Sequence, residues 1–375
     1  QGNILKRVNT SFSTYLKSQI IKNDRRNLGI FVNYRTLKFA DNRSSEPSIN
    51  SRLNYSDSFF NQLIQTTTFY ENNSGSIAQQ EFTYLEVDPG RGVYMWNDYN
   101  NNGIQELQEF EVAPFPDLAK YVRIFLPNQV FIKTHQNKFS QALVCNPAGW
   151  NTSNGVKKFL SHFYNQTNFS LDRKIKKQQD NFDLNPFSTA TENLLGLNTS
   201  FRNSLFYNKG KQHHTTTYTY TNNHIKSLLN SGSLENNLKS HQLQYVHLIQ
   251  KTWQLSNVFV YSNTLSFSDT YASRNYELKN YGLEPKVSYL FSNNASVSCF
   301  YSFKNKQNSI GNLETLQQNQ WGVICNYLSE KQFTLNAEYA FYTNKFSGNA
   351  LSPVGFTMLE GLQSGKNATW RLLLQ

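Results

Sequence analysis

Hydrophobic and polar residues alternate along much of this chain with a period of two. In the segment 332–341 the odd positions from Phe333 to Phe341 are hydrophobic, whereas the even positions from Gln332 to Glu338 are polar. Successive side chains of a β-strand point to opposite faces of the sheet. The alternation therefore predicts a strand with one apolar and one polar face.

The same pattern recurs from one end of the chain to the other. Two short connections, at Asn293-Asn294 and Ser329-Glu330, separate pairs of alternating segments and predict β-hairpins. We expect about 14 antiparallel strands in up-and-down order, many of about ten residues or longer. The alternation is clearest in segments 12–20, 28–34, 195–207, 259–267, 287–291, 295–303 and 321–327.

The length of these segments distinguishes two kinds of β-protein. Strands in soluble sandwiches have about five or six residues, whereas a tilted strand that crosses a bilayer needs about nine to eleven. Short turns also alternate with longer polar connections, expected at 42–49 and 305–318, as in barrels with short periplasmic turns and long outer loops. The sequence therefore predicts an all-β fold of antiparallel up-and-down hairpins that forms all or part of an outer-membrane β-barrel.

The middle of the chain differs from both ends because prolines and acidic residues concentrate there. We expect barrel hairpins over 1–82, a long loop or insert over 83–147, and further hairpins over 148–375, with a basic and polar loop at 171–190. The chain begins without an initiator methionine and ends without the aromatic residue that commonly ends a closing barrel strand. We therefore expect a portion of a longer protein.

The insert contains a run of oxygen-bearing side chains with the spacing of a calcium-binding loop. Calcium prefers six to eight oxygen ligands, and a glycine at the sixth position lets the chain turn sharply enough to supply them. Gly103 occupies that position, and the alternative interpretation is an Asn/Gly-rich surface turn with solvated acids. The predicted Ca²⁺ ligands are Asp98, Asn100, Asn102, the backbone carbonyl of Ile104, Glu106 and Glu109.

Composition adds a constraint on partners. Aromatic residues make up 15% of the chain, charged residues only 16%, and the net charge is +11. The dense basic run at 173–177 is not accompanied by a nucleic-acid-binding motif, so we expect no nucleic-acid partner. A basic loop explains the run, and lysines and arginines facing anionic lipid head groups would explain the net charge.

The sequence does not indicate an enzyme. His213 and His214 are adjacent and would point to opposite faces of one strand, so that strand alone could not give them a shared metal. The stretch 361–367 resembles a phosphate-binding loop but lacks its spacing and its Ser/Thr, which favours a turn between strands. The chain also lacks an apolar run of the roughly 18 to 20 residues that a transmembrane helix needs.

Two stretches resemble a known group of proteins. The run YLEVDPGRGVYMWNDYNNNGIQELQEFE, from Tyr84 to Glu111, is followed by Asp117 and YVR at 121–123, and LEGLQSGKNATW spans 359–370. Together these stretches, within about 80–140 and 355–370, resemble large uncharacterised outer-membrane or surface β-barrel proteins of Bacteroidota. The resemblance implies a Gram-negative cell envelope and an association with type nine secretion.

Three functions follow as expectations. The first is a non-catalytic outer-membrane β-barrel component of a cell-envelope complex, such as a pore, translocon or scaffold, with extracellular loops, a structural Ca²⁺, and membrane lipid and other envelope proteins as partners. The second is an extracellular β-rich adhesin or glycan-binding module in which Tyr94 and Trp96 stack on sugars. The third is a TonB-dependent type of importer, which would also require a plug domain.

Overall fold

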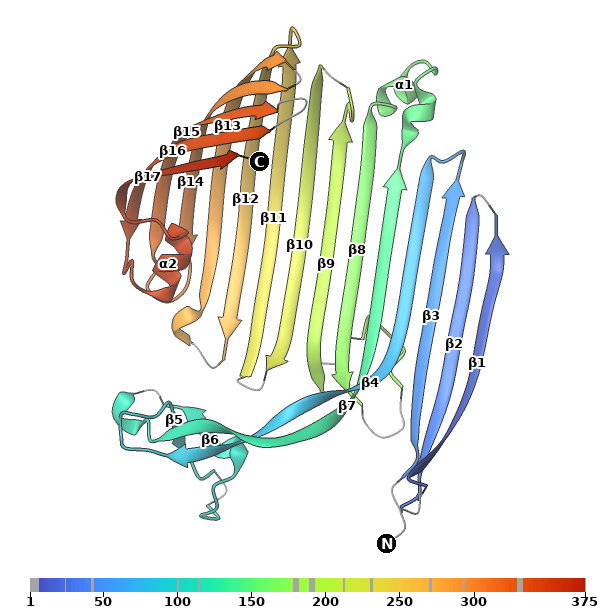
Figure 1. The fold of residues 1–375 in the computed structure, drawn as a ribbon, viewed down its shortest axis with the longest axis vertical. Coiled ribbons are helices and arrows are strands. Elements are labelled where there is room, and N and C mark those ends of the chain that lie inside the picture. Colours follow the sequence, from blue (N-terminus) through green and yellow to red (C-terminus); the bar gives the residue numbers. More distant parts are fainter. Residues whose placement is uncertain are drawn as a thin grey trace.

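The fold is that of a single large antiparallel sheet, which confirms the predicted all-β class. The computed structural model describes residues 7–23, 25–41, 44–99, 101–113, 115–177, 182–188, 193–211, 213–229, 232–269, 272–292, 294–328 and 333–374. Fifteen strands form the sheet, and two short ones belong to an insert. The sheet strands run up and down in chain order (Figure 1).

Most strands have 14 residues or more, as the alternation predicted. Such lengths need uninterrupted pairing, and the registers between neighbours are continuous except for shifts in four of the pairings. The sheet strands are β1 (Asn9–Lys22), β2 (Arg26–Phe39), β3 (Glu46–Phe59), β4 (Ile64–Glu86), β7 (Tyr121–Cys145), β8 (Phe163–Lys176), β9 (Leu194–Tyr207), β10 (His214–Leu229), β11 (Gly232–Ile249), β12 (Trp253–Ser268), β13 (Tyr276–Ser292), β14 (Ala295–Asn308), β15 (Thr315–Leu328), β16 (Thr334–Ser347) and β17 (Gly365–Leu374).

The sheet is open. Each strand pairs with the next one along the chain, except that β4 pairs with β7 across the insert. In the described part of the chain, β1 pairs only with β2, and β17 pairs only with β16. Strands β15 to β17 curl over in front of the sheet in Figure 1, so this end of the sheet is strongly curved.

The two faces of the sheet differ in chemistry. Neighbouring strands place Leu283, Val287 and Val323 on one side, which we call the apolar face. The opposite side carries Ser288 and Ser298, whose hydroxyl groups form a 2.8 Å hydrogen bond, and we call it the polar face. On β13 and β14 the polar face is the more buried of the two: Ser288 and Ser298 are each 5% exposed, whereas Val287 is 42% exposed.

Two connections are shorter than the sequence indicated. The loop expected at 42–49 spans residues 40–45, because β3 begins at Glu46. The loop expected at 305–318 spans residues 309–314, because β14 continues to Asn308. The hairpin predicted around 293–294 is confirmed by the pairing of β13 with β14, although Asn293 itself, like Ser329-Glu330, lies outside the described residues. Of the predicted loop 171–190, residues 171–176 continue β8.

The longer connections lie at both ends of the sheet. The insert between β4 and β7 and the segment 348–364 lie at the lower end in Figure 1. The segment 146–162, which contains η3 (Pro147–Trp150) and α1 (Val156–Leu160), lies at the upper end. No helix in the described part of the chain is long and apolar enough to cross a membrane.

The segment 348–364 contains α2 (Pro353–Leu359), which packs on the polar face of the sheet. The Ser352 hydroxyl accepts a hydrogen bond from the Gly355 N–H at 2.9 Å, and Pro353 occupies the first helical turn. Met358 and Leu359 are buried against Leu316 of β15. This cluster is a hydrophobic patch on a face that is otherwise mainly polar.

Charged groups add a second attachment of α2. Lys306 Nζ donates to the Met358 carbonyl oxygen at 2.9 Å and lies 2.5 Å from Glu360 Oε1. Burial alone would raise the pKa of Glu360, but the hydrogen bond and charge of Lys306, together with the charge of Lys304, lower it overall. The carboxylate is therefore held ionised beside the end of the helix.

Acid is expected to loosen α2. Because the folded-state pKa of Glu360 is lowered, its contribution is complete above the unfolded value of about 4.3 and is lost as pH falls through the folded value. The side chain is 49% exposed, so the effect should be at most about 1 kcal/mol. Hydrogen exchange of 348–364 at pH 7 and pH 3 would measure it; Glu360→Gln should be less protected at pH 7 and insensitive to pH. Equal acid sensitivity in both proteins would contradict this role.

Candidate functional site: the lobe with the calcium-type loop

The predicted calcium loop lies in a lobe carried away from the main sheet by a two-stranded ribbon. Strands β4 and β7 have 23 and 25 residues and remain paired from Ile64 with Cys145 to Glu86 with Tyr121. In Figure 1 the ribbon leaves the lower end of the sheet and ends in the lobe. The predicted insert 83–147 thus contains the lobe, at 87–120, and also β7, which is part of the sheet.

A small hairpin forms the centre of the lobe. Strand β5 (Tyr94–Trp96) pairs with β6 (Phe110–Val112), and the two short 3₁₀ helices η1 (Leu107–Glu109) and η2 (Pro116–Leu118) flank β6 in sequence. Tyr94 also pairs with Tyr121 of β7, which joins the hairpin to the ribbon. The loop at 98–109 is therefore the connection between two paired strands.

Aromatic rings form the core of the lobe. Tyr84 stacks on Phe110 with ring centroids 4.0 Å apart, and it meets Tyr94 edge-on at 5.1 Å. Phe110 also meets Tyr121 edge-on at 5.0 Å. Such pairs add about 0.5–1.5 kcal/mol each beyond the area they bury. The rings come from β4, β5, β6 and β7, so they fix the hairpin to the end of the ribbon.

A cation and a glycine complete this packing. The Arg123 guanidinium lies 4.7 Å from the ring centre of Phe82 and 4.9 Å from that of Tyr94, which are cation–π distances. Gly92 passes so close to the chain before β7 that a Cβ atom would lie 2.6 Å from the Ala119 carbonyl oxygen. A larger residue at this position would push the hairpin away from β7.

The first half of the calcium-type loop is organised around Asp98. Its Oδ2 accepts a hydrogen bond from the Gly103 N–H at 2.8 Å, and its Oδ1 accepts one from the Asn102 N–H at 3.2 Å. The Asn102 side chain accepts from the Ile104 N–H at 2.7 Å. Gly103 has a positive φ of 69°, which glycine adopts without strain. The sharp turn predicted at Gly103 is therefore present.

The end of the loop is organised around Glu109, which is only 2% exposed. Its Oε2 accepts a hydrogen bond from Trp96 Nε1 at 2.9 Å and another from the Glu106 N–H at 3.3 Å. Its second oxygen, Oε1, is buried and lacks a hydrogen-bond partner among the described residues. A buried carboxylate oxygen without a partner is costly unless a donor or a cation satisfies it.

The other predicted ligands give less evidence about a calcium site. Asn100 lies outside the described residues, and the Ile104 side chain is exposed while its carbonyl is the predicted ligand. Glu106 forms a reciprocal capping arrangement with Glu109. In the described part of the chain, no three His, Cys, Asp or Glu residues are grouped as a metal site. The structure thus fits the predicted turn and buried carboxylate, and the Ca²⁺ itself stays a prediction.

Two hydrogen bonds to Glu111 connect the start of the loop to β6. The Tyr99 hydroxyl and the Asn97 side-chain amide both donate to the Glu111 carboxylate. The hydrogen bond to Glu111 raises the pKa of Tyr99. Glu111 is thus engaged within the lobe and is not one of the predicted ligands, which makes it a suitable control position.

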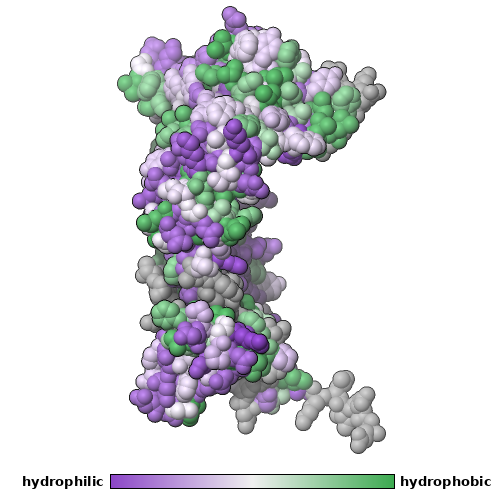
Figure 2. Space-filling model, turned by 90° about the vertical axis from the view of Figure 1, so that its left-hand side faces the viewer, coloured by the Kyte–Doolittle hydropathy of each residue, from purple (hydrophilic) through white to green (hydrophobic). Residues whose placement is uncertain are grey.

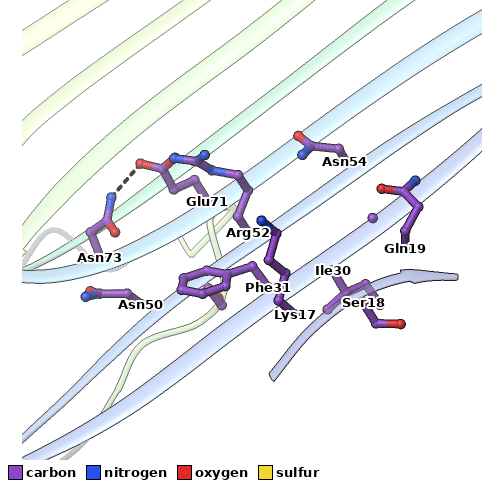
Figure 3. A pocket seen from close by; sticks show the side chains of 12 residues that line it. Lys17, Ser18, Gln19, Ile30, Phe31, Asn50, Arg52, Asn54, Glu71 and Asn73 are labelled. Atoms are coloured by element: carbon purple, nitrogen blue, oxygen red, sulfur yellow. Dashed lines mark hydrogen bonds and ion pairs between the residues drawn. The ribbon is translucent and has the colours of Figure 1, made fainter. Parts of the chain in front are cut away.

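A hollow on the polar face of β1 to β4 is a second candidate site, which the sequence pattern did not predict. It has a volume of about 380 Å³ and is lined by residues from all four strands. Figure 3 shows Arg52 and Asn73 directed toward Glu71; Arg52 Nη2 lies 2.8 Å from Glu71 Oε2, and Asn73 Nδ2 donates to Oε1 at 2.5 Å. These groups come together only because β3 and β4 are in register, with Arg52 opposite Glu71.

Comparisons with known proteins do not add a family or a function. No protein-family model matches the chain, and a search of curated proteins gives no match. Evidence on function therefore comes from the distribution of side chains over the two faces of the sheet and from the geometry of the lobe.

Proposed function

We propose that this chain is a membrane-embedded β-sheet of a bacterial outer membrane, forming part of the wall of a pore, translocon or scaffold without catalytic activity. The observation that carries the proposal is an inverted distribution of polarity over β12 to β16: apolar side chains of the apolar face are exposed there, whereas polar side chains of the polar face are buried. Over β4, β7 and β8 the same apolar face instead carries the buried polar residues Asn72, Asn137 and Arg173. A soluble sheet with one solvated face does the reverse, because it packs its apolar face against a core.

The buried residues of the sheet are mainly polar. Ser302 is 4% exposed, and Gln318 and Asn344 are each 2% exposed. On the apolar face, Trp321 is 48% and Tyr339 is 54% exposed. Figure 2 shows hydrophobic residues at the surface among hydrophilic ones on the side of the molecule that it presents. Contact with lipid would remove these apolar side chains from water, which is favourable.

The apolar residues also form a band of limited height. On β13 the apolar face reads Tyr281, Leu283, Pro285, Val287 and Tyr289. At a rise of about 3.3 Å per residue this is about 26 Å along the strand, or about 20 Å in height for a tilt of ~40°. Outer-membrane strands carry an apolar band about 25 Å tall with aromatic residues at its borders.

Polar residues mark the lower border of the band on neighbouring strands. Asn319 of β15 lies opposite Thr343 of β16, and Thr343 lies opposite Lys366 of β17. Immediately above them on the same face, Trp321 lies opposite Phe341. A change from apolar to polar residues at matched positions on three strands is what a membrane–water interface requires.

Of the two rings expected to stack on sugars in a glycan-binding module, Tyr94 is buried and Trp96 is engaged at its N–H group. Tyr94 is 7% exposed and packs against Tyr84, while the Trp96 indole N–H is bonded to Glu109. Stacking on a sugar needs an open ring face, so the expectation that Tyr94 is an exposed platform was wrong. The lobe rings contribute to folding of the lobe.

Dependence on detergent tests the membrane proposal. The purified chain should stay monodisperse in detergent micelles or lipid vesicles and aggregate when the detergent is removed, because the exposed apolar band would otherwise face water. A chain that stays monomeric and folded in buffer without detergent would overturn the proposal.

We also propose that the loop at 98–109 binds Ca²⁺ and thereby stiffens the lobe. Two observations support this: the Asp98 carboxylate already organises the turn at Gly103, and Glu109 holds a buried oxygen that has no hydrogen-bond partner among the described residues. A cation near that oxygen would remove the cost of leaving it unpaired. The few charged ligands suggest a dissociation constant of about 10⁻⁴–10⁻³ M, as in extracellular modules.

Calcium is expected to stabilise the lobe measurably. For a dissociation constant of about 10⁻⁴ M, about 10 mM Ca²⁺ should add about 2.7 kcal/mol of stability to the lobe. Hydrogen exchange of residues 97–111 with calcium and with chelator would measure this. Asp98→Asn and Glu109→Gln should lose most of the calcium effect, whereas Glu111→Gln, which makes the same charge change in the same lobe, should keep it. Equal exchange of the unmodified lobe in calcium and in chelator would contradict the proposal.

A further inference from the structure

A short segment of the chain lies against the sheet over β4, β7 and β8. Residues 182–188 belong to the connection between β8 and β9, at the lower end of the sheet in Figure 1. Phe187 meets Phe139 of β7 edge-on at 5.0 Å and stacks on Phe169 of β8 at 6.3 Å. We call residues 182–188 the strap.

Polar groups of the sheet hold the strap at Asp183 and Leu184. The Asn137 side-chain amide donates to the Asp183 carbonyl oxygen at 2.7 Å, and the Tyr70 hydroxyl donates to the Leu184 carbonyl oxygen at 2.7 Å. Arg173 is 3% exposed, and its Nη1 lies 2.6 Å from Asp183 Oδ2. The polar residues that interrupt the apolar face in this part of the sheet therefore serve to hold the strap.

His135 lies behind these contacts and is 1% exposed. The Asp183 carbonyl can only accept, so Asn137 turns its NH₂ group to the strap and its Oδ1 to Asn72. Asn72 must then donate from Nδ2, and the same NH₂ group lies 2.7 Å from His135 Nε2. A donor facing Nε2 requires this nitrogen to be an acceptor, so Nε2 carries no proton.

The other ring nitrogen indicates the same protonation state. The Ser74 hydroxyl donates to the Ile49 carbonyl oxygen at 3.2 Å, so it accepts from His135 Nδ1 at 3.4 Å. His135 is therefore neutral, with its proton on Nδ1, while the strap is in place. A second proton, on Nε2, would meet the Asn72 amide hydrogens and break the chain of hydrogen bonds that leads to the strap.

The surroundings of His135 do not favour a charged imidazole. The Phe182 ring of the strap lies 5.9 Å from the His135 ring, and burial disfavours the ionised form of a side chain. The Asp183 carboxylate is already paired with Arg173. The charged groups on the elements packed around His135 are, among the described residues, Lys133, Arg173, Lys177, Asp183 and Glu46, which lies 2.9 Å from Lys133. An imidazolium would add a positive charge to a cluster that is already positive.

We propose that the strap is a pH-sensitive device, held on the sheet at neutral pH and released in mildly acidic solution, with His135 as the sensor. An imidazole that water can reach binds a proton below about pH 6.5, whereas His135 under the strap does not. The released state therefore binds one proton more, so the hold of the strap is complete above about pH 6.5 and weakens as pH falls below it. The strap contacts protein groups, so this proposal and the membrane proposal can fail separately.

Hydrogen exchange of residues 182–188 at about pH 7.5 and about pH 5.5 tests the proposal, with labelling times matched to the intrinsic exchange rate at each pH. The protection of the strap should be about tenfold lower at the acidic pH, as expected for one histidine that is protonated only after release. Carboxylates ionise near pH ~4, so the pair of Arg173 with Asp183 stays charged throughout. An equally protected strap at both pH values would overturn the proposal.

Two variants assign the response to His135. His135→Gln can accept from Asn72 but cannot become charged, so its strap should be equally protected at both pH values. His224→Gln is the matched control, because it removes another histidine of the same face, on β10, and should leave the pH response unchanged. A pH response in His135→Gln equal to that of the unmodified protein would contradict the role of His135.

A second measurement decides the case in which His135→Gln loses the strap at both pH values. NMR of the imidazole nitrogens in the unmodified protein, with labelled histidine, reports which nitrogen of His135 is protonated. At about pH 7.5 the proton should be on Nδ1, and Nε2 should gain one together with the loss of strap protection. A proton on Nε2 at this pH, or a charged His135 under a protected strap, would overturn the proposal.

Discussion

Replacing Val323 by arginine is expected to reduce the free energy of unfolding in lipid vesicles by about 2–4 kcal/mol. Val323 lies in the middle of the apolar band on β15, between Trp321 and Cys325, and is 39% exposed. A cation at this depth must leave water or distort the bilayer, and that cost is largest near the bilayer centre. Urea unfolding in vesicles, followed by tryptophan fluorescence, would measure it.

Asn319→Arg is the matched control for this variant. It lies on the same strand and the same face, four residues away, at the polar border of the band. An arginine near the interface should cost only about 0–1 kcal/mol. If both variants changed the stability equally, the apolar face would not be in contact with the hydrocarbon part of the membrane.

Replacing Phe110 by alanine is expected to unfold the lobe locally and to cost it about 3 kcal/mol. Phe110 contacts both Tyr84 of the ribbon and Tyr121 of β7, so its removal leaves a gap between the hairpin and the ribbon. Hydrogen exchange resolved by segment should show residues 87–120 losing protection. The strands of the main sheet should be unaffected, because they have their own pairing.

Val112→Ala is the control on the same short strand. Its side chain is 42% exposed, so the loss should be within about 0.5 kcal/mol, as for most surface substitutions. If Phe110→Ala also destabilised β8 to β12, the lobe would be a structural part of the sheet rather than a separately packed insert. An unchanged lobe would show that the rings add little to its stability.

Much of the sheet could be predicted from the order of hydrophobic and polar residues along the chain. The alternation from Phe333 to Phe341 became β16, and a hairpin was predicted where β13 pairs with β14. The stretch 361–367 was interpreted as a turn between strands, which was wrong in part: 361–364 follow helix α2, and 365–367 begin β17. These elements are local: a period of two and a short polar turn act over a few residues, so the sequence carries the signal directly.

Helix α2 was missed although a signal for it exists. Ser352 followed by Pro353 is a common start for a helix, and the Ser352 side chain does cap it. The helix is short, and its stability comes from burial of Met358 on the sheet. A helix of this length is only marginally stable by itself. It therefore depends on packing against the sheet, which cannot be recognised from the sequence alone.

The calcium-type loop also combines features that the sequence predicted with features that only the structure shows. The spacing from Asp98 to Glu109 predicted the turn at Gly103, and the structure contains it. The inward direction of Glu109 depends on Trp96, which reaches it only because β5 pairs with β6. Asn100, the predicted ligand between them, lies outside the described residues.

The sequence by itself determined strand length, the polarity of each face and the turn of the calcium-type loop, because these depend on residues close together along the chain. Only the tertiary structure decided that β4 pairs with β7 to carry a lobe, that the polar face of β12 to β16 is the buried one, and that β1 and β17, the edges of the sheet among the described residues, point the same way. Those features depend on pairing between distant segments and on the number of strands, which the alternation of a single strand does not encode.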